Sequence, residues 1–304
     1  MSVTEPVRKR EAHPERNLER PPAPEPLAVP VYDNHTHLEF EDGLTPLTPE
    51  ESLALAESVG VRGVVQVGTD LETSRWSAKL AAADRRVLAA VALHPNEAPR
   101  LADRGLLSEH LSEIARLAAQ PRVRAVGETG LDFFRTGEDG RESQLESFEA
   151  HIEIAKQNDI ALQIHDRDAH EAVVETLLRV GAPERTVFHC FSGDTDLAEI
   201  CAEHGWYLSF AGTVTFKNAG GLRDALRVAT RDRILLETDA PFLTPAPFRG
   251  RPNAPYLVPH TLRLMAETLE ISEDELAADI ARNTEAVYGS WDSDLPTPTE
   301  KVTA

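Results

Sequence analysis

The sequence predicts an α/β fold in which eight β/α units close into one TIM-type (β/α)8 barrel. Short runs rich in β-branched and apolar residues alternate with longer helical patterns, the order that a parallel sheet of β/α units requires. The chain of 304 residues lies within the size range of one such barrel with tails. A doubly wound sheet is less favoured, because no glycine-rich phosphate loop or dinucleotide fingerprint interrupts the pattern.

The predicted elements follow one another in strict alternation. The strands cover residues 31–37, 61–68, 87–94, 123–130, 160–166, 186–193, 206–212 and 234–239. The helices cover residues 48–59, 71–83, 106–119, 141–158, 168–180, 194–204 and 218–230, and a final pair at 259–270 and 272–288 closes the barrel. Thr48, with Glu51 three residues later, and Asp194 are expected N-caps, because their side chains can accept hydrogen bonds from free backbone N–H groups.

The ends of the chain differ in composition from the predicted barrel, which we place at residues 31–290. Residues 1–30 hold seven of the 21 prolines and have no apolar periodicity, so we expect a disordered proline-rich tail, and residues 291–304 are expected to form a second one. No run approaches the ~18 apolar residues of a membrane span, and the N-terminus lacks the apolar core of a secretory signal. We therefore expect a soluble, cytoplasmic protein without membrane association, in which Cys190 and Cys201 are reduced thiols.

The net charge of −20 argues against a general nucleic-acid-binding surface, because non-specific affinity for DNA comes from Lys and Arg neutralising phosphates. Bound metal cations could still supply a local positive charge for a phosphodiester. The charge therefore limits the class of nucleic-acid-binding protein but does not exclude a metal-centred nuclease.

Residues of the types that bind metal fall at the C-terminal ends of the predicted strands, which in such a barrel form the catalytic face. Taken singly, each has a structural explanation: a histidine can be hydrogen-bonded in the core, and a carboxylate can cap a helix. Their shared location favours one metal site, and mixed imidazole and carboxylate ligands suit zinc, iron or manganese better than magnesium. The six candidate ligands are His35, His37, Glu128, His165, His189 and Asp239.

The other histidines have different expected places. His94 ends the third predicted strand, so we expect it at the same rim as a substrate contact and not as a ligand. Exposed positions on helices or loops are expected for His110, His151, His170, His204 and His260.

At these residues the sequence resembles the TatD family of metal-dependent hydrolases, from about Val31 to Gly289. The shared motifs are YDNHTHLE, LHPNEAP, VGETGLDFFR, LQIHDRDA, VFHCFSG, LETDAPFLTP and RNTEAVYG. The resemblance implies an amidohydrolase-like barrel with two divalent cations (zinc, magnesium or manganese) that hydrolyses DNA phosphodiesters, in some members as a 3′-to-5′ exonuclease. It implies one cation on His35, His37, Glu128 and Asp239, and a second on Glu128, His165 and His189. Asn34, Thr36, Thr129 and the proline-rich N-terminus depart from the common pattern without removing a ligand.

For a two-cation hydrolase we expect Glu128 to bridge the ions and Asp239 to orient the attacking water and accept its proton. The expected substrate is DNA, at single-stranded ends. Its phosphates are expected to contact loop residues on the same rim, and its bases could stack on nearby aromatic rings. The candidate cations are Arg135, Arg167, Lys217, Arg249 and Arg251, and the aromatic residues are Phe133, Phe134 and Phe248.

Two other functions remain open at this point. An amidohydrolase acting on a lactone, amide or cyclic imide would suit the acidic chain, although such enzymes often use a modified lysine on the fourth strand, where this chain has Glu128. A non-catalytic, metal-stabilised scaffold would have a closed coordination shell, against which Asp239 and His94 argue weakly.

Overall fold

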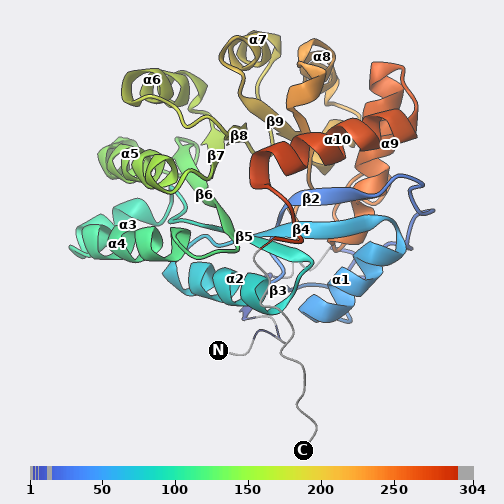
Figure 1. Cartoon of the computed structure of the whole chain (residues 1–304), viewed down its shortest axis with the longest axis horizontal. Coiled ribbons are helices and arrows are strands. Elements are labelled where there is room, and N and C mark those ends of the chain that lie inside the picture. The colour runs from blue at the N-terminus through green and yellow to red at the C-terminus, as the bar shows by residue number, and fades with distance from the viewer. Residues whose placement is uncertain (1–2, 4, 6, 12–15, 294–304) are drawn as a thin grey trace, which may run out of the picture.

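The computed structural model describes residues 3, 5, 7–11 and 16–293, and its centre is a parallel barrel (Figure 1). The eight barrel strands pair in chain order, each with its sequence neighbour and each in the parallel sense. They are β2 (Val31–Thr36), β4 (Val61–Val67), β5 (Val87–Val91), β6 (Val123–Asp132), β7 (Ala161–Arg167), β8 (Thr186–Phe188), β9 (Tyr207–Phe210) and β10 (Ile234–Leu236). All eight predicted strands are confirmed.

The ring closes between the first and last barrel strands just beyond the end of β10. Thr36 forms a parallel bridge with Ala240, and the His37 N–H donates to the Ala240 carbonyl at 2.8 Å. The Asp239 N–H donates to the His35 carbonyl at 2.9 Å. The same hydrogen bonds that close the barrel therefore hold three of the candidate ligands beside one another.

The helices lie outside the strands (Figure 1). The Thr48 capping box is present, and the Asp194 side chain accepts from the Leu197 N–H at 3.1 Å, so both predicted caps are confirmed. A short helix after β5, α3, was not predicted. The helices are α1 (Pro49–Ser58), α2 (Leu71–Ala83), α3 (Ala98–Asp103), α4 (Leu107–Ala118), α5 (Arg141–Asn158), α6 (His170–Val180), α7 (Thr195–His204), α8 (Gly220–Val228), α9 (Val258–Leu269) and α10 (Glu273–Tyr288). None of the helices in these described ranges is long and apolar enough to cross a bilayer.

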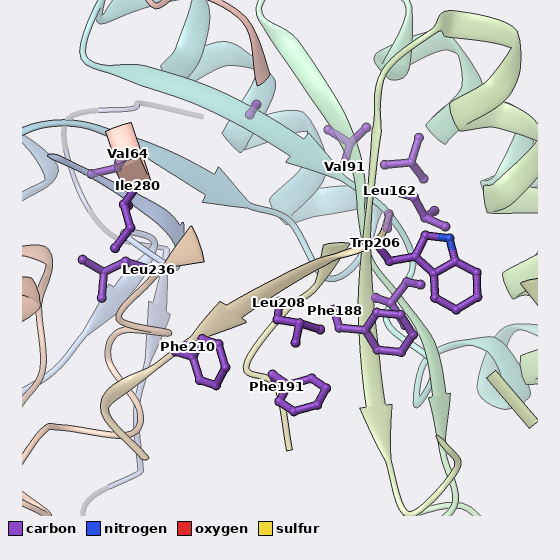
Figure 2. Packing of buried hydrophobic residues seen from close by; sticks show 14 of the residues in the cluster. Val64, Val91, Leu162, Phe188, Phe191, Trp206, Leu208, Phe210, Leu236 and Ile280 are labelled. Atoms are coloured by element: carbon purple, nitrogen blue, oxygen red, sulfur yellow. The ribbon is translucent and has the colours of Figure 1, made fainter. Parts of the chain in front are cut away.

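Strand alternation divides the buried apolar residues into two clusters. In the smaller cluster every barrel strand contributes a side chain, as only a barrel interior allows, and it includes Val65, Leu88 and Leu235. In the larger cluster the intervening residues pack against the helices. Figure 2 shows part of this outer layer, where Phe188 lies beside Trp206 with ring centroids 5.8 Å apart. Each such side chain stabilises the fold by roughly 1.5–3 kcal/mol.

The N-terminal region differs from the expected tail. Residues 7–11 and 16–30 lie against the barrel: β1 (Arg8–Lys9) pairs in parallel with β3 (Phe40–Glu41). Leu27 is buried, and the Tyr256 hydroxyl donates to the Pro21 carbonyl at 2.6 Å. The expected disordered tail is therefore wrong for these residues. Hydrogen bonds and ion pairs to distant residues hold the segment in place, and such contacts produce no apolar periodicity by which the sequence could reveal them.

The C-terminal boundary also needs correction. Trp291 is 6% exposed and stacks on Tyr32 with a centroid separation of 4.1 Å. Its carbonyl accepts from Arg122 Nη1 at 2.9 Å. Residues 291–293 therefore belong to the barrel, and the rest of the expected C-terminal tail, residues 294–304, lies outside the described residues.

His151 was expected on an exposed helix surface and is fully buried on the inner side of α5. Its Nε2 accepts from the Leu93 N–H at 3.2 Å, and its Nδ1 lies 2.9 Å from the Thr129 hydroxyl oxygen. Because Nε2 accepts, the ring is the neutral tautomer that donates from Nδ1. The expected exposure of His151 is therefore wrong, because the face of α5 that carries this residue packs against the barrel.

Candidate metal centre

The six candidate ligands meet at one mouth of the barrel. His35 and His37 lie two residues apart at the end of β2, so their side chains point to the same side of the strand. Glu128 and His165 lie on β6 and β7, and His189 directly follows β8. Asp239 comes after β10 with φ of 51°, a left-handed turn that Asp tolerates better than most residues.

One half of the site is formed by two imidazoles facing two carboxylates. The Nε2 atoms of His35 and His37 are 3.3 Å apart. His37 Nε2 lies 3.6 Å from Glu128 Oε1 and 3.5 Å from Asp239 Oδ1, and His35 Nε2 lies 4.0 and 3.8 Å from the same two oxygens. The ligand atoms of His35, His37 and Glu128 all lie within 4.8 Å of one another, and so do those of His35, His189 and Asp239, as donors suited to a cation would.

The other half of the site is organised around the second oxygen of Glu128. Glu128 Oε2 lies 3.0 Å from His189 Nε2, 3.1 Å from His165 Nδ1 and 3.8 Å from His94 Nε2. Glu128 is 5% exposed, and each of its oxygens faces a different group of histidines. The carboxylate of Glu128 therefore lies between two groups of histidines, with one oxygen toward each.

A second set of buried acceptors fixes which imidazole nitrogen faces the cluster. His37 Nδ1 donates to the Val67 carbonyl at 3.0 Å. His189 Nδ1 lies 3.2 Å from Glu237 Oε1, and His165 Nε2 lies 3.3 Å from Asp132 Oδ2. Such outer partners orient metal-binding histidines and raise their basicity.

Sequence reasoning missed these acceptors and one further carboxylate, Asp33. Asp33 is fully buried and accepts from the backbone N–H groups of His35 at 3.2 Å and Thr238 at 2.9 Å, which ties β2 to the segment after β10. The signal was present: Asp33 stands two residues before His35 and Glu237 two residues before Asp239, the spacing that places side chains on the same side of an extended chain.

The electrostatics of the cluster favour bound positive charge. Burial opposes ionisation of Glu128, but His94, His189 and His165 hold its pKa well below the ordinary value. Burial would lower the pKa of His189, yet Glu128 and Glu237 raise it to about 10. Divalent cations would therefore replace protons when they bind here.

A cleft of about 620 Å³ opens over the cluster. His94, Arg135 and Arg167 line it, as expected, together with Arg8 and Asn96, which sequence reasoning did not include. The pKa of His94 is lowered to about 3, chiefly by burial, so its imidazole is neutral at physiological pH and can still donate one hydrogen bond.

The remaining predicted substrate contacts, Phe134 among them, lie outside the lining of the cleft. Phe134 is 62% exposed, and the Arg167 guanidinium lies 4.1 Å from its ring centroid. Arg249 lies over Phe216 at 4.3 Å, and Arg251 donates to the carbonyls of residues 19 and 20, so neither belongs to the lining of the cleft. The same holds for Lys217, Phe133 and Phe248.

Comparisons with known proteins find relatives over most of the chain. The family model described as TatD related DNase matches residues 32–289. A Mycobacterium tuberculosis protein named as an uncharacterized metal-dependent hydrolase, TatD, is 42% identical over 263 residues, which cover 85% of this chain and 98% of that relative. A Bacillus subtilis relative, the uncharacterized metal-dependent hydrolase YabD, is 35% identical with the same coverage. The crystal structure of YjjV, a TatD homologue from Escherichia coli, has a TM-score of 0.75 at 28% identity, covering 86% of this chain and 98% of its own.

Proposed function

Because this chain belongs to the TatD family of metal-dependent hydrolases, we propose that it hydrolyses phosphodiester bonds of DNA and removes nucleotides from single-stranded 3′ ends. One observation carries the proposal. The Glu128 cluster lies at the floor of a cleft whose walls hold Arg135 and Arg167, cationic groups that match the charge of a phosphate backbone.

The residues present fit two divalent cations, with zinc, manganese and magnesium as candidates. His35, His37, Glu128 and Asp239 would hold one, and Glu128, His165 and His189 the other. Cations bound there would lower the pKa of water toward ~7 and neutralise charge on a phosphoryl oxygen. Asp239 is 14% exposed at its side chain, so one carboxylate oxygen can orient the attacking water and accept its proton.

The walls of the cleft would position the substrate. The neutral His94 imidazole lies next to Glu128 and can donate its N–H to a phosphoryl oxygen of the bound strand. Arg135 and Arg167 would hold flanking phosphates. The exposed ring of Phe134 would stack on a base, a contact that tolerates any sequence and suits single strands.

A small-molecule hydrolase is the second candidate. The net charge of −20 favours it, since a lactone or amide substrate needs no phosphate-binding surface. It differs from the first candidate in its dependence on the cleft arginines. Removal of Arg135 and Arg167 should weaken the cleavage of DNA and leave turnover of a neutral lactone unchanged.

The test begins with metal-free protein, prepared with a chelator and reloaded with Mg²⁺, Mn²⁺ or Zn²⁺. Each form is incubated with a 5′-labelled single-stranded oligonucleotide and, separately, with a panel of lactones and amides. We expect metal-dependent shortening from the 3′ end that Asp239→Asn abolishes. Turnover of a lactone or amide without shortening of DNA under any metal would reject the nuclease in favour of the second candidate.

A further inference from the structure

The N-terminal segment that was expected to be a disordered tail lies along the rim of the cleft and forms hydrogen bonds and ion pairs with it. We call residues 7–11 and 16–20 the strap. The N–H groups of Val7 and Arg8 donate to the Glu39 carbonyl, each at 2.9 Å, and Arg10 N–H donates to the Glu41 carbonyl at 3.0 Å. The family match begins at residue 32, and the 42% identical relative is covered over 98% of its own length by 85% of this chain. The strap therefore lies outside the part of the chain that the family model matches.

The arginines of the strap hold two segments of the rim together. Arg16 makes a bidentate ion pair with Asp42 at 2.6 and 2.5 Å, and the Asp42 side chain is only 4% exposed. Arg10 also contacts Asp42, donates to the Pro241 carbonyl and lies 4.9 Å from the ring centroid of Phe242. These contacts join the segment after β2 to the segment that follows Asp239.

Arg8 has a different position, because its side chain enters the cleft. It lines the same cavity as His37, Glu128 and Asp239, and its side chain is 32% exposed. Its guanidinium donates to the Thr69 hydroxyl oxygen at 2.9 Å and pairs with Asp70.

The anchor of Arg8 is itself rigid. Asp70 caps α2 by accepting from the Thr73 N–H at 2.8 Å, so the guanidinium is held against a fixed helix terminus. Thr69 and Asp70 each use one donor of a group that carries five. A preorganised cation of this kind is suited to a phosphate, which arginine binds with fixed geometry.

We propose that the strap adds an anion subsite to the cleft, in which Arg8 binds a substrate phosphate other than the one at the metal cluster. The inference rests on the proposed function, since it assumes a substrate with several phosphates. Among the basic residues of β1 and its neighbours, Arg8 lines the cleft, whereas Arg10 and Arg16 pair with Asp42. Lys9, with its side chain 81% exposed, points outward. Arg8 is a substrate-binding residue in this account and takes no part in bond cleavage.

The binding experiment compares the full-length protein with Arg8→Ala, Arg8→Lys and Lys9→Ala. Lys9→Ala is the matched control, because it removes the same charge from the adjacent residue of β1. Fluorescence anisotropy with a labelled single-stranded oligonucleotide, in chelator, gives Kd as a function of salt. We expect Arg8→Ala to raise Kd about tenfold. The plot of log association constant against log salt concentration should become less steep by about 0.7, which corresponds to the loss of one phosphate contact. Arg8→Lys should recover part of the binding, and Lys9→Ala should change Kd less than about twofold.

The cleavage experiment uses two substrates with the metal-loaded proteins. For the oligonucleotide, Arg8→Ala should raise KM about tenfold and leave kcat unchanged. For bis(4-nitrophenyl) phosphate, which carries a single phosphate, both constants should stay at the wild-type values.

The outcomes separate the subsite from the proposed function. Equal behaviour of Arg8→Ala and Lys9→Ala, or an equal loss on both substrates, overturns the subsite even if DNA is cleaved. Weakened binding in Arg8→Ala alone, with no cleavage of DNA by the wild type, supports the subsite and rejects the nuclease. Thermal unfolding of each variant shows whether the substitution destabilises the strap. A displaced strap would also impair cleavage of the single-phosphate substrate, so weaker oligonucleotide binding with unchanged cleavage of that substrate assigns the effect to Arg8 itself.

Discussion

Glu237→Gln tests how much the buried carboxylate behind His189 contributes to metal binding. Glu237 is fully buried, with Oε1 3.2 Å from His189 Nδ1 and 2.8 Å from the Cys190 backbone nitrogen. On its other side, His189 faces Glu128 Oε2 at 3.0 Å. Glutamine has the same shape and keeps an acceptor oxygen, so the substitution removes the charge and leaves the packing in place.

The size of the effect follows from the distance. Two full charges 3.2 Å apart would interact by about 5 kcal/mol at an effective dielectric constant of ~20. A metal-bound imidazole carries only part of a charge, and the amide dipole keeps part of the interaction. We therefore expect a loss of about 1.4–2.7 kcal/mol, which is a ten- to hundredfold weaker metal affinity and agrees with the usual cost of removing such a partner.

The assay is a competition titration of Zn²⁺ or Mn²⁺ between the metal-free protein and a chelating dye. Glu171→Gln, on the exposed face of α6, is the matched control and should bind metal as the wild type does. Wild-type affinity in Glu237→Gln, or an equal loss in both variants, would refute the assignment of Glu237 as the group that orients His189.

Three further predictions address catalysis and stability. Asp239→Asn should lower kcat on DNA at least about 100-fold with metal saturated, as expected for loss of a general base; an unchanged kcat in a steady-state assay would contradict its role. Burial lowers the pKa of His151 to about 4. The unfolded chain thus binds the proton first, and up to about 3 kcal/mol of stability is present above pH 6.5 and lost as the pH falls toward 4. Urea titrations of the metal-free protein should show this loss, with a shallower pH dependence in His151→Gln; parallel curves for the two proteins would count against it. Trp291→Ala should cost about 3–5 kcal/mol because its ring is buried against Tyr32, and a Tm near that of the wild type would show that this residue is not part of the barrel.

Much of the fold could be predicted because a parallel barrel strand has a local signature. Mostly apolar runs, such as residues 61–68 before Thr69 and residues 87–93 before His94, lead into polar residues, and their spacing leaves room for one crossover helix. The ligands could be predicted for the same reason, since the C-terminal ends of all strands face one mouth. The predicted strand boundaries were enough to place His189 and Asp239 at this mouth.

The parts that could not be predicted depend on contacts between distant residues. Arg16 reaches Asp42, and Arg251 reaches the backbone of residues 19 and 20, through polar contacts that have no sequence period. A proline-rich, charged segment has the same composition whether it is solvated or fixed by such contacts. The burial of His151 was missed because one residue of an amphipathic helix can face either the solvent or the barrel, and only the packing of α5 decides.

We propose that Glu128 bridges two divalent cations at the mouth of the barrel, and the metal content of the purified protein tests this proposal most directly. Wild type and Glu128→Ala are stripped with chelator, dialysed against Mn²⁺ and analysed for bound metal by mass spectrometry, with circular dichroism to confirm folding. We predict about two ions per wild-type chain, as a two-metal site requires, and fewer than one in Glu128→Ala. A wild-type protein that binds no more than one ion, or a folded Glu128→Ala protein that keeps both, would contradict the claim.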